Sequence, residues 1–178
     1  MREWVYSRNS VFETLRAGRR QGYRLLVAEG VQEKGRLAEI LSLAASRKIP
    51  VERVARPRLD KLSSGHQGVA LEVGEYPYND IADILMLAES RAEAPFILIL
   101  DTLQDPQNLG TLLRTAEIVG VHGVILPLAR TATITPSVVN SSSGACEHLL
   151  VAQVNLAQAI AALKEQDIWV IGLEGGGS

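Results

Sequence analysis

The 178-residue sequence has little of what secreted, metal-binding or membrane-spanning proteins use. Its single cysteine, Cys146, excludes a disulfide within the chain. Its three histidines lie far apart without zinc-binding spacing, so we predict no metal site. No apolar run approaches the roughly 18 residues of a membrane span, and residues 1–10 lack the apolar block of a signal peptide. We therefore expect a globular cytoplasmic protein with no membrane partner.

The net charge of −2 conceals a strong asymmetry along the chain. Residues 1–61 hold 14 Lys and Arg against 7 Asp and Glu, whereas residues 62–178 hold 4 against 13. Clustered cations bind phosphate backbones because they release condensed counterions. The basic part therefore suits a nucleic-acid partner, and a solvated basic face without a partner is the other reading of the same charges.

The first 94 residues predict a compact α/β unit followed by a linker. A short helix is expected to begin at Ser10, in a capping box with Glu13, and to stop at Gly18. Further elements follow to residue 75: a strand at 23–30, a helix ending before Pro50, a strand at 51–55 and a strand near 69–75. Residues 76–94 then form a linker and a leading helix.

From residue 95 onward, apolar strands alternate with helices. Strands are expected at 96–101, 123–127, 149–154 and 168–174, and helices at 108–119, 135–141 and 155–166. Strands that are continuously apolar and separated by helices predict a parallel sheet covered on both faces. Four of them favour an α/β layer of the nucleotide-binding type.

The segment DPQNLGTLLR, residues 105–114, connects the strand at 96–101 to the next helix. Polar groups between a buried strand and a helix N-terminus often form a ligand site. We expect Asn108 to cap the free backbone N–H groups of this helix. Arg114 is the only cation between Arg91 and Arg130; it either binds a phosphate bidentately or lies in solvent, paired with Glu117.

Two later segments allow both a functional and a structural reading. In NSSSGACEHLL, residues 140–150, Glu147 either orients a ligand amine or hydroxyl or is an ordinary loop acid. The serines at 141–143 have no histidine and acid arranged beside them, so a hydrolase triad is rejected. The tail GLEGGGS resembles a ligand-cradling loop but has neither a Walker nor a dinucleotide fingerprint, and an engineered linker explains it equally well.

These segments resemble a known family. LDTLQDPQNLGTLLRTAEIVGVHGVILP is similar to the first motif of the SpoU-type (TrmH-like) branch of SPOUT RNA 2′-O-ribose methyltransferases, roughly D-P-x-N-x-G-x-x-x-R-x-A-x-x-x-G. SSSGACEHLLVAQVNLAQAIAALKEQDIWVIG continues the likeness. SRNSVFETLRAG and SGHQGVALEV resemble the start and end of the L30e/L7Ae-like RNA-binding domain in the 23S ribosomal RNA guanosine methyltransferase subgroup.

The resemblance implies an α/β fold in three parts. Residues 1–75 would be the L30e-like RNA-binding domain, 76–94 the linker and leading helix, and 95–178 the N-terminal part of a SPOUT domain with a Rossmann-like parallel sheet. The family's glycine-rich second and third motifs, which bind the methyl donor in a trefoil knot, would follow residue 178. The resemblance therefore implies a truncated or engineered form that lacks the knot segment.

The implied function is S-adenosylmethionine-dependent 2′-O-methylation of RNA. Ribosomal RNA would be the partner, with transfer RNA a further candidate, and intact family members are usually homodimers. Two rival interpretations remain open. One is a non-catalytic RNA-binding module on a partial α/β scaffold, and the other is a different nucleotide enzyme with a chance match to the motif.

Carried over by position, the resemblance implies roles for individual residues. Arg114 would be the catalytic arginine, Asn108 would hold the active-site loop, and Glu147 would shape the same site. Arginine is a poor base because its pKa exceeds about 12, so we expect Arg114 to stabilise the developing alkoxide or to grip the adjacent phosphate. The candidate donor contacts are Gly172 and Glu174. The candidate RNA contacts are Arg8, Asn9, Arg19, Arg20, His66 and Gln67.

Overall fold

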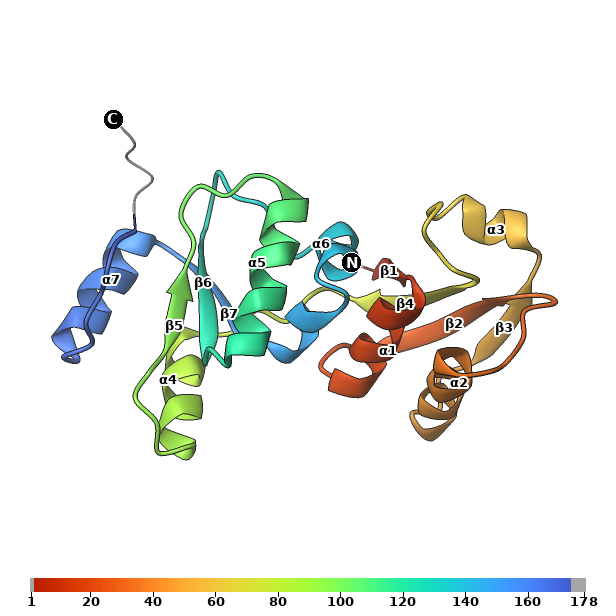
Figure 1. The fold of residues 1–178 in the computed structure, drawn as a ribbon, viewed down its shortest axis with the longest axis horizontal. Helices are drawn as coiled ribbons and strands as arrows, with labels where there is room; N and C mark the ends of the chain where they lie inside the picture. Colours follow the sequence, from red (N-terminus) through yellow and green to blue (C-terminus); the bar gives the residue numbers. More distant parts are fainter. Residues whose placement is uncertain (1, 174–178) are drawn as a thin grey trace.

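The computed structural model describes residues 2–173 and confirms a mixed α/β fold (Figure 1). A four-stranded sheet has the order β1-β4-β2-β3, and a three-stranded sheet has the order β5-β6-β7. The strands are β1 (Arg2–Tyr6), β2 (Gly22–Ala28), β3 (Val51–Val54), β4 (Val69–Gly74), β5 (Ile97–Ile99), β6 (Gly123–Pro127) and β7 (Val151–Val154). The helices are α1 (Arg8–Ala17), α2 (Arg36–Ser46), α3 (Arg56–Asp60), α4 (Ile81–Ser90), α5 (Pro106–Val119), α6 (Pro136–Ser141), α7 (Leu156–Glu165) and the 3₁₀ helix η1 (Ala145–His148).

The first sheet is mixed, and its edge strand β1 was not predicted. β1 pairs antiparallel with β4, with Val5 opposite Leu71, while β2 and β3 run parallel.

Helix α1 begins earlier than predicted. Ser7, at φ 74, precedes α1, so Ser10 lies inside the helix, where its hydroxyl donates to the distant carbonyl of Val139 at 3.3 Å. The local sequence suggested that Ser10 caps the helix, whereas in the folded protein its hydroxyl donates to a carbonyl of the second part.

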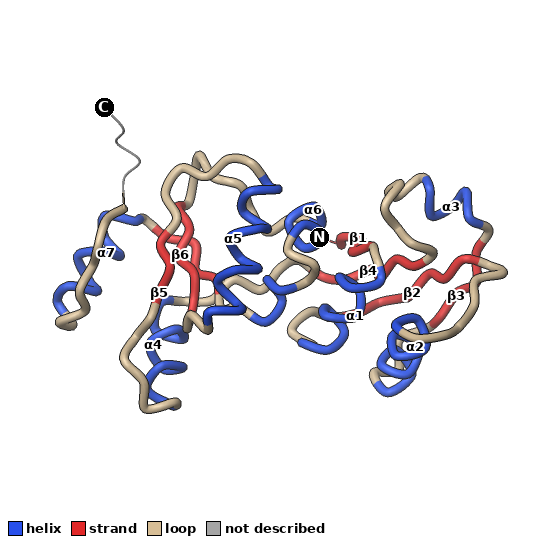
Figure 2. The backbone as a smooth tube through the Cα atoms, in the orientation of Figure 1, coloured by secondary structure: helices blue, strands red, loops and turns tan. Residues whose placement is uncertain are grey.

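The second sheet is parallel, as predicted, and has helices on both faces. Side chains of adjacent β6 residues point to opposite faces, because strand side chains alternate. Val124 packs in the cluster that contains buried residues of α5 and α6, whereas Ile125 packs with Ile84 of α4 and Leu163 of α7. The tube trace in Figure 2 shows α5 and α7 on either side of this sheet.

The predicted fourth strand of this sheet is wrong for the residues that the structure describes. Residues 168–173 form no strand, and Trp169 and Leu173 are 92% and 98% exposed. A strand needs a neighbour that accepts and donates its backbone hydrogen bonds. Neither edge of the β5-β6-β7 sheet pairs with this segment, so its apolar pattern by itself did not form a strand.

The two parts share one hydrophobic core. A single cluster of buried side chains runs from Val5 and Leu71 in the first sheet to Leu113 and Val139 on the helices of the second part. Helix α6 lies between the two sheets, and α1 lies against the first sheet on the side of α6 (Figure 1). Among residues 2–173 no helix has the length and apolar character of a membrane span. The fold therefore places α1 of the first part directly against the region around α5.

Candidate active site

The start of α5 is fixed by Asp105 rather than by Asn108. The Asp105 carboxylate accepts hydrogen bonds from the backbone N–H groups of Gln107 and Asn108, both at 3.2 Å. Pro106 occupies the first helical position, where a missing N–H costs nothing. The prediction that Asn108 caps the helix is therefore wrong, and its side chain is exposed in the first turn.

Gly110 lets α5 approach the end of α6 closely. A Cβ atom at this position would lie 1.9 Å from the hydroxyl oxygen of Ser141 and 2.9 Å from the backbone nitrogen of Ser142. The Ser141 hydroxyl also donates to the carbonyl of Pro106 at 3.1 Å. Since residues four apart share a helix face, this contact directs Arg114 toward the turn at residues 142–143.

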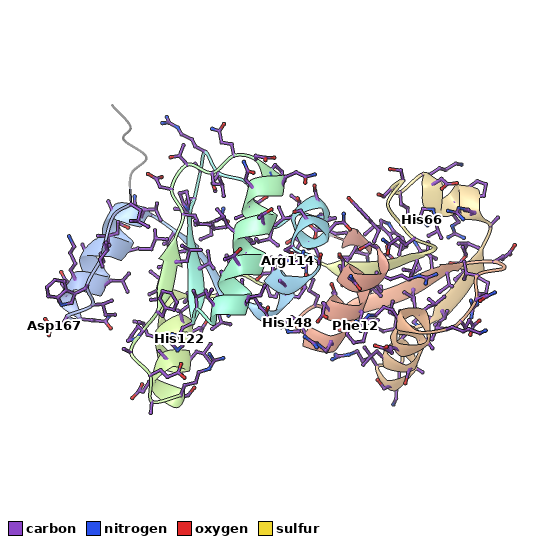
Figure 3. All side chains as sticks on the ribbon, in the orientation of Figure 1. Phe12, His66, Arg114, His122, His148 and Asp167 are labelled. Atoms are coloured by element: carbon purple, nitrogen blue, oxygen red, sulfur yellow. The ribbon has the colours of Figure 1, made fainter. Side chains whose placement is uncertain are left out.

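Arg114 lines a cleft between the two parts of the chain (Figure 3). The cleft has a volume of about 150 Å³ and is bordered by α5, η1, the turn at 142–143 and α1. The Arg114 side chain is exposed and forms no hydrogen bond or ion pair with any residue of the described range. The alternative ion pair with Glu117 does not form, so the guanidinium is available to a ligand.

The floor of the cleft is a small polar network. One carboxylate oxygen of Glu13 accepts from Nε of Arg16 at 2.8 Å and from Nε2 of His148 at 2.7 Å. An Nε2 that donates to Glu13 cannot also accept from the Arg16 guanidinium, which lies 3.4 Å away. Gly144, at φ +86, allows this contact because a Cβ there would lie 2.5 Å from the Cβ of Glu13.

Glu147 lies outside the cleft, in a buried ion pair. Its carboxylate is 2.9 Å from the guanidinium of Arg20, and both side chains are 0% exposed. Burial raises the pKa of Glu147, and the nearby Arg20 charge opposes that shift. Arg20 also pairs with Glu3 at 3.0 Å. The structure thus places a predicted site acid and a predicted RNA contact where neither meets solvent.

Arg19 joins the same two parts of the chain. Its guanidinium donates to the carbonyls of Leu149 and of Pro77, the latter at 3.0 Å, and to the side chain of Asn79. Two adjacent arginines thus hold the segment after η1 against the first sheet. In the sequence they look like exposed cations in a basic region, because nothing local shows that their partners in the second part, Glu147 and Leu149, lie 127 and 130 residues away.

The remaining predicted RNA contacts lie at the start of α1 and in the loop before β4. The backbone N–H and Nε of Arg8 donate to the side chain and carbonyl of Gln67, at 3.0 and 3.2 Å. Asn9 is exposed. His66 is buried: its Nδ1 accepts from the Gly68 N–H at 2.8 Å, so Nε2 of the neutral ring donates to Asp60 at 2.9 Å. His66 therefore holds the loop between α3 and β4 in place.

The predicted donor contacts form no enclosed site within the described residues. Gly172 is exposed, and no atom lies within 4 Å of the position that a Cβ would occupy. Glu174 lies outside the described residues. The residues present around Gly172 thus do not enclose a methyl donor. In residues 2–173 no three His, Cys, Asp or Glu side chains are grouped to hold a metal ion.

Sequence reasoning missed Glu13, Arg16 and His148 as residues of the cleft. Glu13 and Arg16 are three apart on α1, a spacing that predicts a helix-surface pair. That spacing carries no information about a second domain. His148 follows Glu147 directly, and only the turn of η1 sends the two side chains in different directions.

The two α/β parts meet at a cleft that holds an unpaired arginine, and comparison with known proteins shows the family to which they belong. Residues 4–79 match the family described as RNA 2′-O ribose methyltransferase substrate binding. Residues 95–178 match the SpoU rRNA methylase family. The chain is 41% identical over 174 residues to YacO of Bacillus subtilis, a protein assigned to the TrmH family of tRNA/rRNA methyltransferases, covering 97% of this chain and 69% of YacO. The chain belongs to this SpoU/TrmH family.

Further relatives and solved structures support the assignment. A TrmH family protein of Staphylococcus aureus (strain MSSA476) is 42% identical over 153 residues, which is 85% of this chain and 61% of that protein. The SpoU methyltransferase AviRb of Streptomyces viridochromogenes, solved with AdoMet, aligns with a TM-score of 0.70 at 20% identity, covering 93% of this chain and 59% of AviRb. A TrmH family structure from Porphyromonas gingivalis gives 0.69 at 20% identity, with 94% and 60% covered. The chain thus spans about 60% of the length of these structures, which share its fold.

Proposed function

We propose that the chain belongs to an S-adenosyl-L-methionine-dependent RNA 2′-O-ribose methyltransferase that acts on a guanosine of 23S ribosomal RNA. The observation that supports this most directly is the unpaired guanidinium of Arg114 in a cleft between the two family-matched parts. A substrate that contacts both parts would pass this guanidinium. Transfer RNA is the competing substrate, since relatives are named for both RNAs.

The proposed chemistry assigns Arg114 an electrostatic role. Methylation of a ribose 2′-hydroxyl requires loss of its proton and alignment of the oxygen with the methyl carbon and sulfur. A guanidinium keeps its proton at neutral pH. Arg114 would therefore stabilise the developing alkoxide or hold the adjacent phosphate through paired N–H donors. Asn108, exposed one turn and a half earlier on α5, would hold the active-site loop.

RNA recognition is assigned to the exposed part of the predicted set. Asn9 and Gln67 are exposed around the start of α1, and the half-buried Arg8 lies beside them, with no protein partner for its terminal guanidinium nitrogens among the described residues. Arg19 and Arg20 act through domain docking instead, because their donors are used within the protein. Glu147 would shape the site in the same indirect way, by fixing η1 and with it His148.

The methyl donor is proposed from the family, since AviRb was solved with AdoMet. When bound, S-adenosylmethionine supplies an electrophilic methyl group. The described residues near Gly172 do not enclose a pocket that would hold it. Calorimetric titration with S-adenosylmethionine tests donor binding directly. Micromolar binding supports the enzyme, and an absence of heat supports the alternative of a non-catalytic RNA-binding module.

That alternative is supported by one observation: residues 168–173 form no strand where a fourth strand was expected, and Trp169, Ile171 and Leu173 are exposed. A methylation assay separates the two functions. The chain is incubated with labelled S-adenosylmethionine and 23S, 16S or transfer RNA, and the nucleosides are identified by mass spectrometry. 2′-O-methylguanosine from 23S RNA, lost in Arg114→Ala, supports the proposal. RNA binding without methylation of any substrate supports the module.

We further propose that the protein acts in the cytoplasm as a homodimer. Large apolar side chains are exposed on α5 and after α7, including Ile118, Val119, Trp169 and Ile171. Exposed apolar side chains of this size favour association. Light scattering coupled to size exclusion measures the mass in solution, and a monomer at every concentration would contradict the dimer.

A further inference from the structure

We propose that Arg16, on the RNA-binding part, and Arg114, on the methylase part, together hold the phosphodiester backbone of the substrate RNA. The cleft between α1 and α5 would then be the point where the RNA strand crosses from one part to the other. The identity of the ligand as RNA rests on the proposed function. The pairing of the two arginines rests on the geometry of the cleft.

The cationic donors of the cleft that have no carboxylate partner belong to these two side chains. Arg16 uses Nε for Glu13 and makes no carboxylate contact through its terminal nitrogens within residues 2–173. Its side chain is 54% exposed. Arg114 has all its donors available. Planar guanidinium groups with free N–H pairs match the geometry of a phosphate.

The cations at the border of the cleft suit an anion such as a phosphate, and its volume of about 150 Å³ leaves room for one. The remaining charged groups at its border are Glu13 and Glu117, with His148 titratable. Glu13 is occupied by Arg16 and His148. An anion entering between the arginines therefore meets the unpaired guanidinium of Arg114, the terminal nitrogens of Arg16 and one uncommitted carboxylate, Glu117.

The cleft exists only because the two parts are docked. Gly144 lets α1 contact the turn before η1, since any Cβ there would overlap Glu13. The buried Arg20–Glu147 pair fixes η1 to the first part from the other side. Arg16 is thereby held beside the Arg114 cleft without any bond between the two arginines. Neither part alone would have this cleft.

We expect both parts of the chain to contact the same ligand, the RNA substrate. Residues 4–79 match a substrate-binding family model and carry Arg16, while residues 95–178 match the methylase model and carry Arg114. A free nucleotide or inorganic anion has no reason to need both parts. A continuous RNA strand bound by the first part must reach the second at their border, where the cleft lies.

Fluorescence anisotropy with a labelled single-stranded RNA oligonucleotide, measured over a range of salt, tests the inference on the full chain. Loss of a charge-assisted contact typically weakens binding about tenfold or more. We expect this loss for Arg16→Ala and for Arg114→Ala, each with a salt-dependence slope lower by about 0.7. The matched control is Arg91→Ala, which removes an exposed charge at the end of α4, outside the cleft.

Histidine NMR provides a local readout that needs no activity. His148 lines the cleft, whereas His122 is buried just before β6 and acts as the internal reference (Figure 3). We expect the ring signals of His148 to shift on addition of the oligonucleotide, and of inorganic phosphate at higher concentration, while those of His122 stay in place. A comparable spectrum for each variant shows that the two parts remain docked.

The outcomes separate this inference from the proposed function. If Arg16→Ala binds RNA with wild-type affinity, the two arginines do not hold the RNA together, although the chain still recognises RNA. The same conclusion follows if the wild-type chain binds RNA and the His148 signals do not move. Weakening by Arg114→Ala but not by Arg16→Ala also overturns it. If the wild-type chain binds no RNA even at low salt, the inference and the proposed function both fail.

Discussion

The guanidinium of Arg20 lies 2.9 Å from a carboxylate oxygen of Glu147, and both side chains are completely shielded from solvent. The two residues are 127 positions apart, in different family-matched parts of the chain. A buried charge pair in such a place contributes little net stability against an apolar pair, but removal of one partner leaves the other charge uncompensated. The pair therefore makes docking of the two parts specific.

Substitution of Arg20 should destabilise the protein strongly. We expect Arg20→Ala to lower the free energy of unfolding by about 3–5 kcal/mol, because Glu147 loses its partner in a buried environment. Arg36→Ala is the matched control, since Arg36 pairs with Glu39 at the surface and such pairs contribute about 1 kcal/mol or less. Urea denaturation measures both. Equal effects of the two substitutions would show that the Arg20 pair is dispensable.

Gly110 should not tolerate alanine, although alanine is the better helix former by about 1 kcal/mol. The added Cβ would overlap Ser141 and the backbone of Ser142, and backbone cannot rotate away. We expect Gly110→Ala to cost about 1–3 kcal/mol in thermal or urea unfolding. Thr111→Ala, at the next and exposed position, is expected to change stability by less than about 0.5 kcal/mol. A stabilised Gly110→Ala would refute the close packing of α5 on α6.

The protein should lose stability at alkaline pH through two buried groups. Burial raises the pKa of Cys146 from 9.0 to about 12, and burial also raises the pKa of Tyr76 well above its ordinary value. Between about 9 and about 12 the folded chain keeps a Cys146 proton that the unfolded chain releases. Stability therefore falls as pH rises through this window. Melting temperatures from about pH 8 to about pH 11 check the direction.

Thiol chemistry gives an independent check of the same burial. The thiolate is the reactive form, so a disulfide reagent should modify Cys146 slowly in the native protein and rapidly in urea. Rapid modification of the folded chain at neutral pH would contradict the raised pKa.

Removal of exposed apolar side chains after α7 should reduce self-association. Trp169 and Leu173 are almost fully exposed, and apolar side chains in water promote non-specific contacts. We expect the double substitution Trp169→Ser and Leu173→Ser to lower binding of an apolar dye and aggregation on heating, while the far-ultraviolet circular dichroism stays unchanged. Loss of secondary structure would instead show that these side chains stabilise the fold.

Arg114→Ala should leave the fold intact. The side chain is exposed and has no partner within residues 2–173, and substitutions at such positions usually change the free energy of unfolding by less than about 0.5 kcal/mol. Urea denaturation measures this. A loss of RNA affinity or methylation in this variant is then attributable to the site, whereas a large loss of stability would reveal a structural role.

The sequence predicted most elements because their signals are local. Apolar runs and periodicity located β5, β6, β7 and the helices around them, and Gly18 ended α1 in the left-handed conformation that glycine tolerates. The two capping predictions were wrong because each involved a residue with another possible partner. Ser10 bonds to Val139 instead of capping α1, and Asp105 rather than Asn108 caps α5.

The sequence by itself determined the α/β class, the motif that carries Arg114, and the basic character of the first part. Only the tertiary structure decided which charges are used inside the protein and which face a ligand. Arg20 and Glu147 find each other in the core, and Arg16 and His148 meet in the cleft beside Arg114. The physical reason is that a charge is either desolvated with a partner or left in water according to contacts between residues far apart in sequence, which composition and spacing do not encode.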